Sequence, residues 1–258
     1  MAMMSDALVH IDRSQSSVAV VSLQRAEKRN ALNIAILEEL TRSLEGLEQD
    51  PTCRVVIIRG EGSVFCAGLD LVEANDPNVA EKSADGIRRV VTLIRESSLI
   101  VIAAAVGGAY AGGAGLLAAC DLAVVAEDLR LGFPEVRRGL VAAIVWGVLV
   151  GKLRDGDLRE LLLVAEPIGA LRAQQMGLVQ WIVPNERVLA HAREMAQHIL
   201  AGGPEAVRES KRLLNRDPRS VDFRSLQSLH ERIRHGAEAR EGFAAFRDRR
   251  EPNWSQNS

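Results

Sequence analysis

Two stretches of the chain place glycine and alanine where a strand is expected to turn into a helix, and their backbone could do chemistry. They are FCAGLD, residues 65–70, and AYAGGAG, residues 109–115. Glycine allows a sharp turn, and the first amide N–H groups of a helix have no partner within that helix. Such groups can receive an anion or a developing oxyanion. Two facing turns would form an oxyanion hole, although the same glycines also suit tight turns and close helix packing.

Glu135, in LGFPEVRRGL, is the side chain best placed to act as an acid or base. It lies between a predicted strand and the apolar segment 140–150. Partial burial there would disfavour the charged carboxylate and raise its pKa, so that it could exchange protons near neutral pH. The alternative is that Glu135 is a surface carboxylate paired with Arg137 or Arg138. The local sequence favours this alternative but does not decide between the two.

Several other chemistries are excluded because their motifs are missing. Neither G-x-x-x-x-G-K-[S/T] nor G-x-G-x-x-G occurs, so neither kind of nucleotide-binding loop is expected. A G-x-S-x-G motif of a serine hydrolase is also absent, as is any His, Asp and Glu spacing that suits a metal, so no metal site is predicted. The histidines all lie away from the stretches above: His10, His191, His198, His230 and His235.

Hydrophobic periodicity predicts the elements that must position these groups. Short β-branched runs predict strands, and apolar residues at helical spacing predict a helix between the first two of them. Strands that alternate with helices pair in parallel, which indicates an α/β core. The expected strands are 18–23, 55–59, 99–106, 122–126 and 179–183, and the expected helices are 34–47, one beginning near Gly113, 158–164 and 170–176.

The chain changes character near residue 186, where we predict a boundary between a core domain, residues 1–186, and a C-terminal helical region, residues 187–258. The segments beyond the boundary are charged, amphipathic and helix-forming, with breaks at 202–204 and 217–218. We expect this region to pack on its own core or on a neighbouring subunit. The helices expected there are 188–200, 205–214 and 221–246.

Composition and charge bound the class of protein. A chain of 258 residues with 47% hydrophobic residues can bury a sizeable core. Its formal charge of −2, from 32 basic and 34 acidic residues, gives no electrostatic reason to expect nucleic acid or an anionic membrane as a partner. The odd number of cysteines, Cys53, Cys66 and Cys120, indicates buried thiols in a reducing compartment, and the N-terminal residues do not resemble a secretory signal. A cytoplasmic location is predicted.

The uncharged run from Ser98 to Cys120 leaves a membrane-spanning helix as a competing interpretation. It is long enough to cross a bilayer, and Gly108 and Gly112 have the spacing of helix-packing motifs. The β-type run 99–106, which ends at a pair of glycines, favours a buried parallel strand instead. We therefore predict no membrane segment.

Six motifs in register resemble the crotonase family, the enoyl-CoA hydratases and isomerases, and together they span nearly the whole chain. They are LQRAEKRNALN (23–33), FCAGLDL (65–71), GGAYAGGAGLLAACD (107–121), FPEVRRGL (133–140), QMGLVQWIVP (175–184) and FRDRREPNW (246–254). The resemblance implies an α/β fold, the crotonase (ClpP-like) spiral of β-β-α repeats, with a C-terminal helical trimerisation region. It also implies a homotrimer or hexamer and an acyl-CoA thioester as substrate. Coenzyme A is then part of the substrate, and no separate cofactor is expected.

The resemblance also implies roles for individual residues. The backbone N–H groups of Leu69 and Gly112 would form the oxyanion hole, and Glu135 would be the general acid and base. The segment 25–28 would border the nucleotide part of the coenzyme, and backbone in the segment 67–71 would face adenine and pantetheine. The substrate-binding residues predicted in this way are Arg25, Glu27, Lys28, Ala67, Asp70, Leu71, Gly113, Trp146 near the expected site, and Arg249 and Arg250 at the phosphates.

The chain departs from the hydratase pattern at one catalytic position. Hydratases of the family commonly use two glutamates, and the first falls on Gly115 here, while VAAIVWG (141–147) replaces the usual PGAGGT. A single glutamate is typical of members that move a double bond, yet the motifs also resemble bacterial hydratases of branched, methylglutaconyl-type thioesters. We predict an enoyl-CoA hydratase, with a Δ3,Δ2-enoyl-CoA isomerase as the alternative and a non-catalytic acyl-CoA-binding paralogue as a third interpretation. A carboxylate from the segment 70–85 could replace the missing acid.

Overall fold

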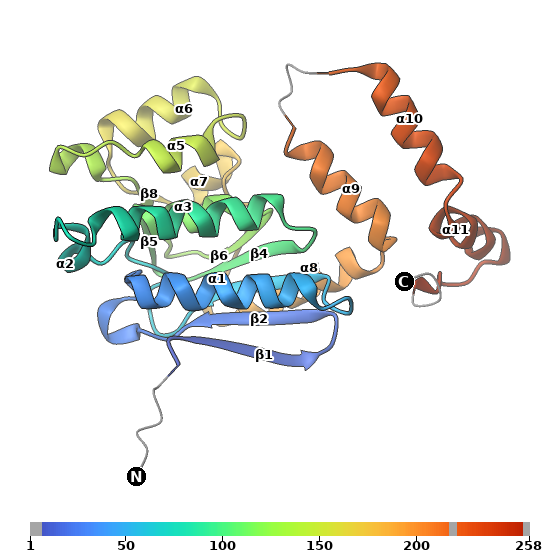
Figure 1. The fold of residues 1–258 in the computed structure, drawn as a ribbon, viewed down its shortest axis with the longest axis horizontal. Coiled ribbons are helices and arrows are strands. Elements are labelled where there is room, and N and C mark those ends of the chain that lie inside the picture. The colour runs from blue at the N-terminus through green and yellow to red at the C-terminus, as the bar shows by residue number, and fades with distance from the viewer. Residues whose placement is uncertain (1–6, 217–220, 255–258) are drawn as a thin grey trace, which may run out of the picture.

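A six-stranded sheet forms the core of the protein, in the strand order β1-β2-β3-β4-β6-β9. Figure 1 labels β1, β2, β4 and β6 of this sheet. The computed structural model describes residues 7–216 and 221–254. β1 is antiparallel to β2, and all other neighbours in this sheet are parallel. Its strands are β1 (Val9–Gln15), β2 (Val18–Leu23), β3 (Val55–Gly60), β4 (Ile100–Ala105), β6 (Leu122–Ala126) and β9 (Trp181–Val183).

The central strands are continuous apolar runs because helices cover both faces of the sheet. Side chains alternate between the two faces along a strand. In β3, for example, Val56 packs in the cluster that includes α1 and α3, whereas Val55 packs against α8 on the opposite face. The three covering helices are α1 (Ile34–Gln49), α3 (Ala80–Glu96) and α8 (Val188–Leu200).

A second sheet contains three short strands in the order β5-β7-β8. In two places a long strand of the first sheet is followed by a short strand of the second and then by a helix, as β4-β5-α4 and β6-β7-α5. This is the β-β-α repeat that the family resemblance implies. The elements are β5 (Gly108–Tyr110), α4 (Gly112–Ala119), β7 (Arg130–Gly132), α5 (Ala143–Leu149) and β8 (Ile168–Gly169).

Short helices connect these elements. The segment expected as a helix at 158–164 is a short α-helix that continues into a π-helix, and the helix expected at 170–176 is present with those bounds. The short helices are η1 (Ala26–Lys28), α2 (Leu71–Ala74), η2 (Glu135–Arg138), α6 (Asp155–Arg159), η3 (Glu160–Val164), α7 (Ala170–Met176) and η4 (Asn185–Arg187).

The C-terminal helices α9, α10 and α11 lie to one side of the core (Figure 1). The boundary predicted near residue 186 precedes α8, whose buried Val188, Ala192 and Ala196 pack on the first sheet. The region that extends from the core therefore begins only after α8. Its helices are α9 (Pro204–Leu214), α10 (Phe223–Arg234) and α11 (Ala237–Asp248).

This arrangement excludes one competing interpretation of the sequence and corrects one expectation. The run 98–120 is not one membrane helix, because it forms β4, β5 and α4, and no described helix is long and apolar enough to cross a membrane. The helix expected over 221–246 is two helices, since Gly236 is the N-cap of α11 and separates it from α10. The break expected at 217–218 lies outside the described residues.

A buried lysine joins the C-terminal region to the core. Lys211 of α9 is 4% exposed. Its Nζ donates to Asp121 Oδ2 at 2.8 Å, to Ile94 O at 2.8 Å and to Leu99 O at 2.6 Å. These bonds use all three ammonium protons. Asp121 also accepts a bond from Val101 N at 2.8 Å, so the same carboxylate contacts both the sheet and α9.

Lys211→Met is expected to lower the free energy of unfolding by about 3 kcal/mol, because it leaves Asp121 and two carbonyl oxygens without their buried partner. Denaturant unfolding followed by circular dichroism measures the change. Lys82→Met is the matched control, since Lys82 forms an exposed 2.8 Å ion pair with Glu38 and should change stability by less than about 0.5 kcal/mol. Equal effects of the two variants would contradict the anchoring role of Lys211.

Candidate active site

Consecutive turns of the spiral bring Leu69, Gly112 and Glu135 to the same end of the second sheet. The segments that precede them are neighbours, because Cys66 pairs with Ala109 in parallel and β5 pairs in parallel with β7. Each of the three residues follows its segment within a short turn. The β-β-α repeat thus gathers positions that are far apart in the sequence.

The direction of the Leu69 amide is set by a bridge to Leu32. Leu32 N donates to Gly68 O at 2.8 Å, and Asp70 N donates to Leu32 O at 2.9 Å. Because alternate residues of an extended segment present their backbone groups to opposite sides, the Leu69 N–H points away from Leu32. It donates no backbone hydrogen bond within residues 7–216 and 221–254. This amide is available to an acceptor.

Gly112 supplies a second free amide beside the first. It is the first residue of α4, so its N–H has no acceptor within the helix, and it donates no other backbone bond in the described part of the chain. A Cβ built on Gly112 would lie 3.6 Å from Leu69 N, so the two turns converge. The preceding Ala111 has φ 47° and ψ −122°, a conformation that costs an alanine energy and that the surrounding structure must impose.

Gly113 allows the two turns to approach closely. A Cβ on Gly113 would lie 2.4 Å from Cys66 O and 2.7 Å from Cys66 Sγ, closer than real side chains come. The Cα of this residue therefore packs on Cys66. The role of Gly113 as a substrate contact, which the resemblance implies, stays a prediction. Cys53, Cys66 and Cys120 are all free and buried, as expected.

Glu135 begins η2 and is partly buried. Its Oε2 is buried and has no hydrogen-bond partner among the described residues. Desolvation raises the pKa of this carboxyl above its usual range, and a hydrogen bond to its own backbone and the charge of Arg138 oppose this shift. Arg137 pairs with Glu166 and not with Glu135. An unpartnered carboxylate oxygen in an apolar setting can take up and release a proton near neutral pH.

The position of the missing glutamate lies close against Val145. A Cβ on Gly115 would lie 3.0 Å from Val145 Cγ2, and Val145 is buried at 6% exposure. Val145 thus gives this side of α4 an apolar wall. The adjacent Trp146 is 52% exposed on α5, on a segment that also exposes Leu140 and Val141.

Asp70 and Glu73, which could have replaced the missing acid, are committed to other contacts. Asp70 Oδ2 accepts from Arg25 Nη1 at 2.6 Å, and Asp70 Oδ1 accepts from Val72 N at 3.0 Å at the start of α2. The hydrogen bond from Arg25 holds the pKa of Asp70 below its usual range. Glu73 Oε2 accepts from Ile34 N at 2.7 Å. Of these three carboxylates, Glu135 is the one that has a buried oxygen without a hydrogen-bond partner among the described residues.

The other residues predicted near the coenzyme differ in their exposure and in whether their backbone N–H groups are free to bind a ligand. Glu27 and Lys28 are exposed on η1. The side chain of Leu71 is 55% exposed, whereas the N–H groups of Ala67 and Asp70 are used in bonds to the carbonyls of Arg29 and Leu32. Only carbonyl oxygens and side chains remain at Ala67 and Asp70 for a ligand.

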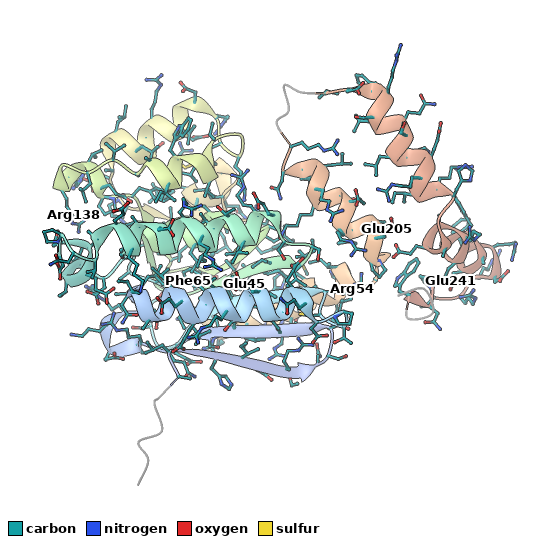
Figure 2. The ribbon with its side chains drawn as sticks, viewed as in Figure 1. Glu45, Arg54, Phe65, Arg138, Glu205 and Glu241 are labelled. Carbon is teal, nitrogen blue, oxygen red and sulfur yellow. The ribbon has the colours of Figure 1, made fainter. Side chains whose placement is uncertain are left out.

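Arg249 and Arg250 do not join this site within one chain. Arg250 pairs with Glu241 of α11 at 2.6 Å. Figure 2 shows Glu241 at one end of the protein and Arg138 of η2 at the other. The prediction that these arginines bind the phosphates therefore fails for the site of the same chain, because α9, α10 and α11 extend away from it.

Sequence reasoning missed Asn30, which supports the loop before Leu69. Asn30 is fully buried, and its Nδ2 donates to Glu61 O at 2.8 Å and to Val64 O at 2.7 Å. Its φ of 53° lies in the left-handed region, which asparagine tolerates better than most residues. An asparagine directly after three charged residues, in the motif 23–33, was the available signal.

Comparison with known proteins identifies the family. The family model described as "Enoyl-CoA hydratase/isomerase" matches residues 13–257, and the chain belongs to this family. Mevalonyl-coenzyme A hydratase sidH of Aspergillus fumigatus is 32% identical to it over 248 residues, which cover 92% of this chain and 91% of that protein. Enoyl-CoA hydratase EchA19 of Mycobacterium tuberculosis is 30% identical over 258 residues, with 96% of each chain covered.

The fold is shared with solved structures of the same family. The crystal structure of an enoyl-CoA hydratase from Bacillus anthracis matches this structure with a TM-score of 0.89 and 30% sequence identity, over 96% of this chain and 98% of the other. The predicted crotonase fold is confirmed. An acyl-CoA substrate is consistent with this membership.

Proposed function

We propose that the protein is an enoyl-CoA hydratase that adds water to a 2-enoyl-CoA with one carboxylate. The observation that carries this proposal is the unpartnered, buried Oε2 of Glu135 at the same end of the short-strand sheet as the free Leu69 and Gly112 amides. Enolate chemistry needs a group that binds the oxyanion and, beside it, a carboxylate with a raised pKa.

The reaction follows from these three groups. The thioester oxygen accepts hydrogen bonds from Leu69 N–H and Gly112 N–H, which stabilise the negative charge as the enolate forms. Glu135 as carboxylate takes a proton from water while the water oxygen bonds to the β carbon. Glu135 then gives that proton to the α carbon, and the carbonyl re-forms. The carboxylate ends in the state in which it began, so a single glutamate suffices.

A branched acyl group is the finer form of this proposal. The Aspergillus fumigatus relative is named for a mevalonyl thioester, which carries a branch at its β carbon. In this chain the apolar segment 140–146 exposes Leu140, Val141 and Trp146 next to η2 and can contact the acyl part of a thioester. A cytoplasmic trimer or hexamer without a separate cofactor completes the proposal.

Isomerisation of a 3-enoyl-CoA is the second candidate, and the contact between Gly115 and Val145 favours it. Gly115 stands where other hydratases commonly have their first glutamate, and beside it lies the apolar side chain of Val145. That side of the site therefore offers no second carboxylate to act as base toward an attacking water molecule. Glu135 would then take a proton from the α carbon and return it to the γ carbon. The same two amides would stabilise the dienolate.

Heavy water distinguishes these functions. The purified protein is incubated in it with straight and branched 2-enoyl- and 3-enoyl-CoA thioesters, and the products are analysed by mass spectrometry. Gain of one water by a 2-enoyl thioester establishes the hydratase. Deuterium incorporation with a shifted double bond and no added water establishes the isomerase. Binding without either change across the panel would support the non-catalytic paralogue.

Glu135 also predicts how stability depends on pH. Because burial raises its pKa above the ordinary value of 4.5, the folded state binds more protons than the unfolded state between the two pKa values. This group therefore destabilises the fold as the pH rises through that window. Glu135→Gln should be more stable than the wild type at pH 7.5, and the difference should vanish below about pH 4. Unfolding free energies at both pH values test this, and a constant difference would contradict it.

A further inference from the structure

The loop that carries the Leu69 amide rests on the segment 25–32. Leu32 bonds to both neighbours of Leu69, through Gly68 O and Asp70 N. The Leu69 N–H lies in the same peptide plane as Gly68 O, so the bond from Leu32 N holds this peptide from one side. The residue that follows, Asp70, holds it from the other side through its own bond to Leu32 O. Whatever holds Asp70 against the segment 25–32 therefore helps to keep that N–H in its direction.

One nitrogen of Arg25 connects the two sides of this bridge. Arg25 Nη1 donates to Asp70 Oδ2 at 2.6 Å and to Ala31 O at 3.0 Å, which are the residues next to Leu69 and Leu32. The two hydrogens of this nitrogen match the two acceptors. The Arg25 and Asp70 side chains are only 16% and 14% exposed, so water screens the pair little.

Arg25 is itself fixed at its backbone. Its N–H donates to Asn30 Oδ1 at 3.0 Å, and the amide nitrogen of Asn30 bonds to the loop at Glu61 O and Val64 O. The guanidinium thus extends from a rigid base. Its short contact with Asp70 is a charge-assisted bond of the strong kind.

We infer that the ion pair between Arg25 and Asp70 is a positioning device for the Leu69 amide of the oxyanion hole, and not a contact to the coenzyme. This inference rests on the proposed function of the site as a thioester-carbonyl binder. Arg25 acts on the reaction through Asp70 and Leu69, without touching the substrate. A misdirected amide would still let coenzyme A bind but would stabilise the enolate less.

Arg25→Met tests the inference, with Arg25→Lys as the conservative variant. Arg25→Met should lower kcat about 10- to 100-fold, because small misplacements of an oxyanion donor are costly, while KM and the Kd of free coenzyme A change less than about twofold. Arg25→Lys keeps the charge and should restore part of the lost kcat. Arg13→Met is the matched control, because it removes a 2.8 Å ion pair with Asp50 at the far end of α1.

A spectroscopic measurement keeps the test independent of turnover. Butyryl-CoA with a ¹³C-labelled carbonyl is bound to each variant, and infrared difference spectroscopy records its carbonyl stretch. The wild type should lower this frequency through its two amides, and Arg25→Met should lose a large part of the shift at equal occupancy. If the wild type turned over no enoyl-CoA but lowered the carbonyl frequency in this way, the proposed function would fail and the inference would stand.

Three outcomes would overturn the inference. A Kd for coenzyme A that rises tenfold in Arg25→Met with unchanged kcat would make Arg25 a coenzyme contact. An unchanged kcat and an unchanged carbonyl frequency would remove any role for the pair in positioning. A fall in kcat that tracks a lower fraction of folded protein, and is equal in Arg13→Met, would make the role merely structural.

Discussion

Glu135→Gln is expected to lower kcat by about 10³-fold while coenzyme A thioesters still bind with nearly the wild-type Kd. Glutamine has almost the same shape as glutamate and fills the same space in η2, but it cannot take a proton from water or from an α carbon. The two oxyanion amides are on other turns and stay in place. The loss should therefore fall on the chemical step and leave binding intact.

The measurement is steady-state kinetics on the substrate that the heavy-water panel identifies, together with calorimetric titration of a saturated thioester. Glu166→Gln is the matched control, because Glu166 is an exposed carboxylate that pairs with Arg137 of η2, the short helix that also contains Glu135. It should keep kcat within about twofold. A Glu135→Gln variant that turns over at the wild-type rate would remove Glu135 from the mechanism.

Two adjacent glycines of α4 should respond to alanine in different ways. In Gly113→Ala the new Cβ would lie 2.4 Å from Cys66 O, which is backbone and cannot rotate away, so we expect a loss of about 3 kcal/mol in unfolding free energy. In Gly112→Ala the nearest atom is Leu69 N at 3.6 Å, an ordinary contact, so stability should change by less than about 1 kcal/mol. The added methyl would nevertheless lie beside the two amides, where we propose that the thioester oxygen binds, and kcat should fall about 10²-fold.

Thermal or denaturant unfolding and steady-state kinetics of both variants are compared. The two glycines serve as controls for each other, because one change acts on the fold and the other on the site. A stable and active Gly113→Ala protein would contradict the close packing of α4 on Cys66. A fully active Gly112→Ala protein would contradict the position of the oxyanion hole.

Much of the core could be predicted from the sequence because its strands are buried on both faces. The runs 18–23 and 122–126 have the predicted bounds, and the helix expected at 188–200 is α8. β1 was not predicted, since it is an edge strand with only one buried side chain, and its polar residues hide its pairing with β2. β5 and β7 are too short for periodicity to detect, although they bring the site together.

For the site, the sequence could indicate which residues matter but not how they meet. Glu135 illustrates the limit, because its local sequence favours a surface ion pair, and only the tertiary structure leaves its Oε2 unpartnered. The contact between Gly115 and Val145 depends on the packing of α4 against α5, which no local pattern encodes. Arg249 and Arg250 lie in a region whose direction from the core is a matter of tertiary packing.

The order of the strands along the chain affects how the protein folds during translation. The face of the first sheet that α8 covers is complete, apart from its edge strand β9, once Ala126 has been made, but α8 ends at Leu200. At about 5–20 residues per second, this apolar face waits roughly 4 to 15 seconds for its cover. During that interval the apolar side chains of Val18, Val20 and Ile57 have no α8 to cover them.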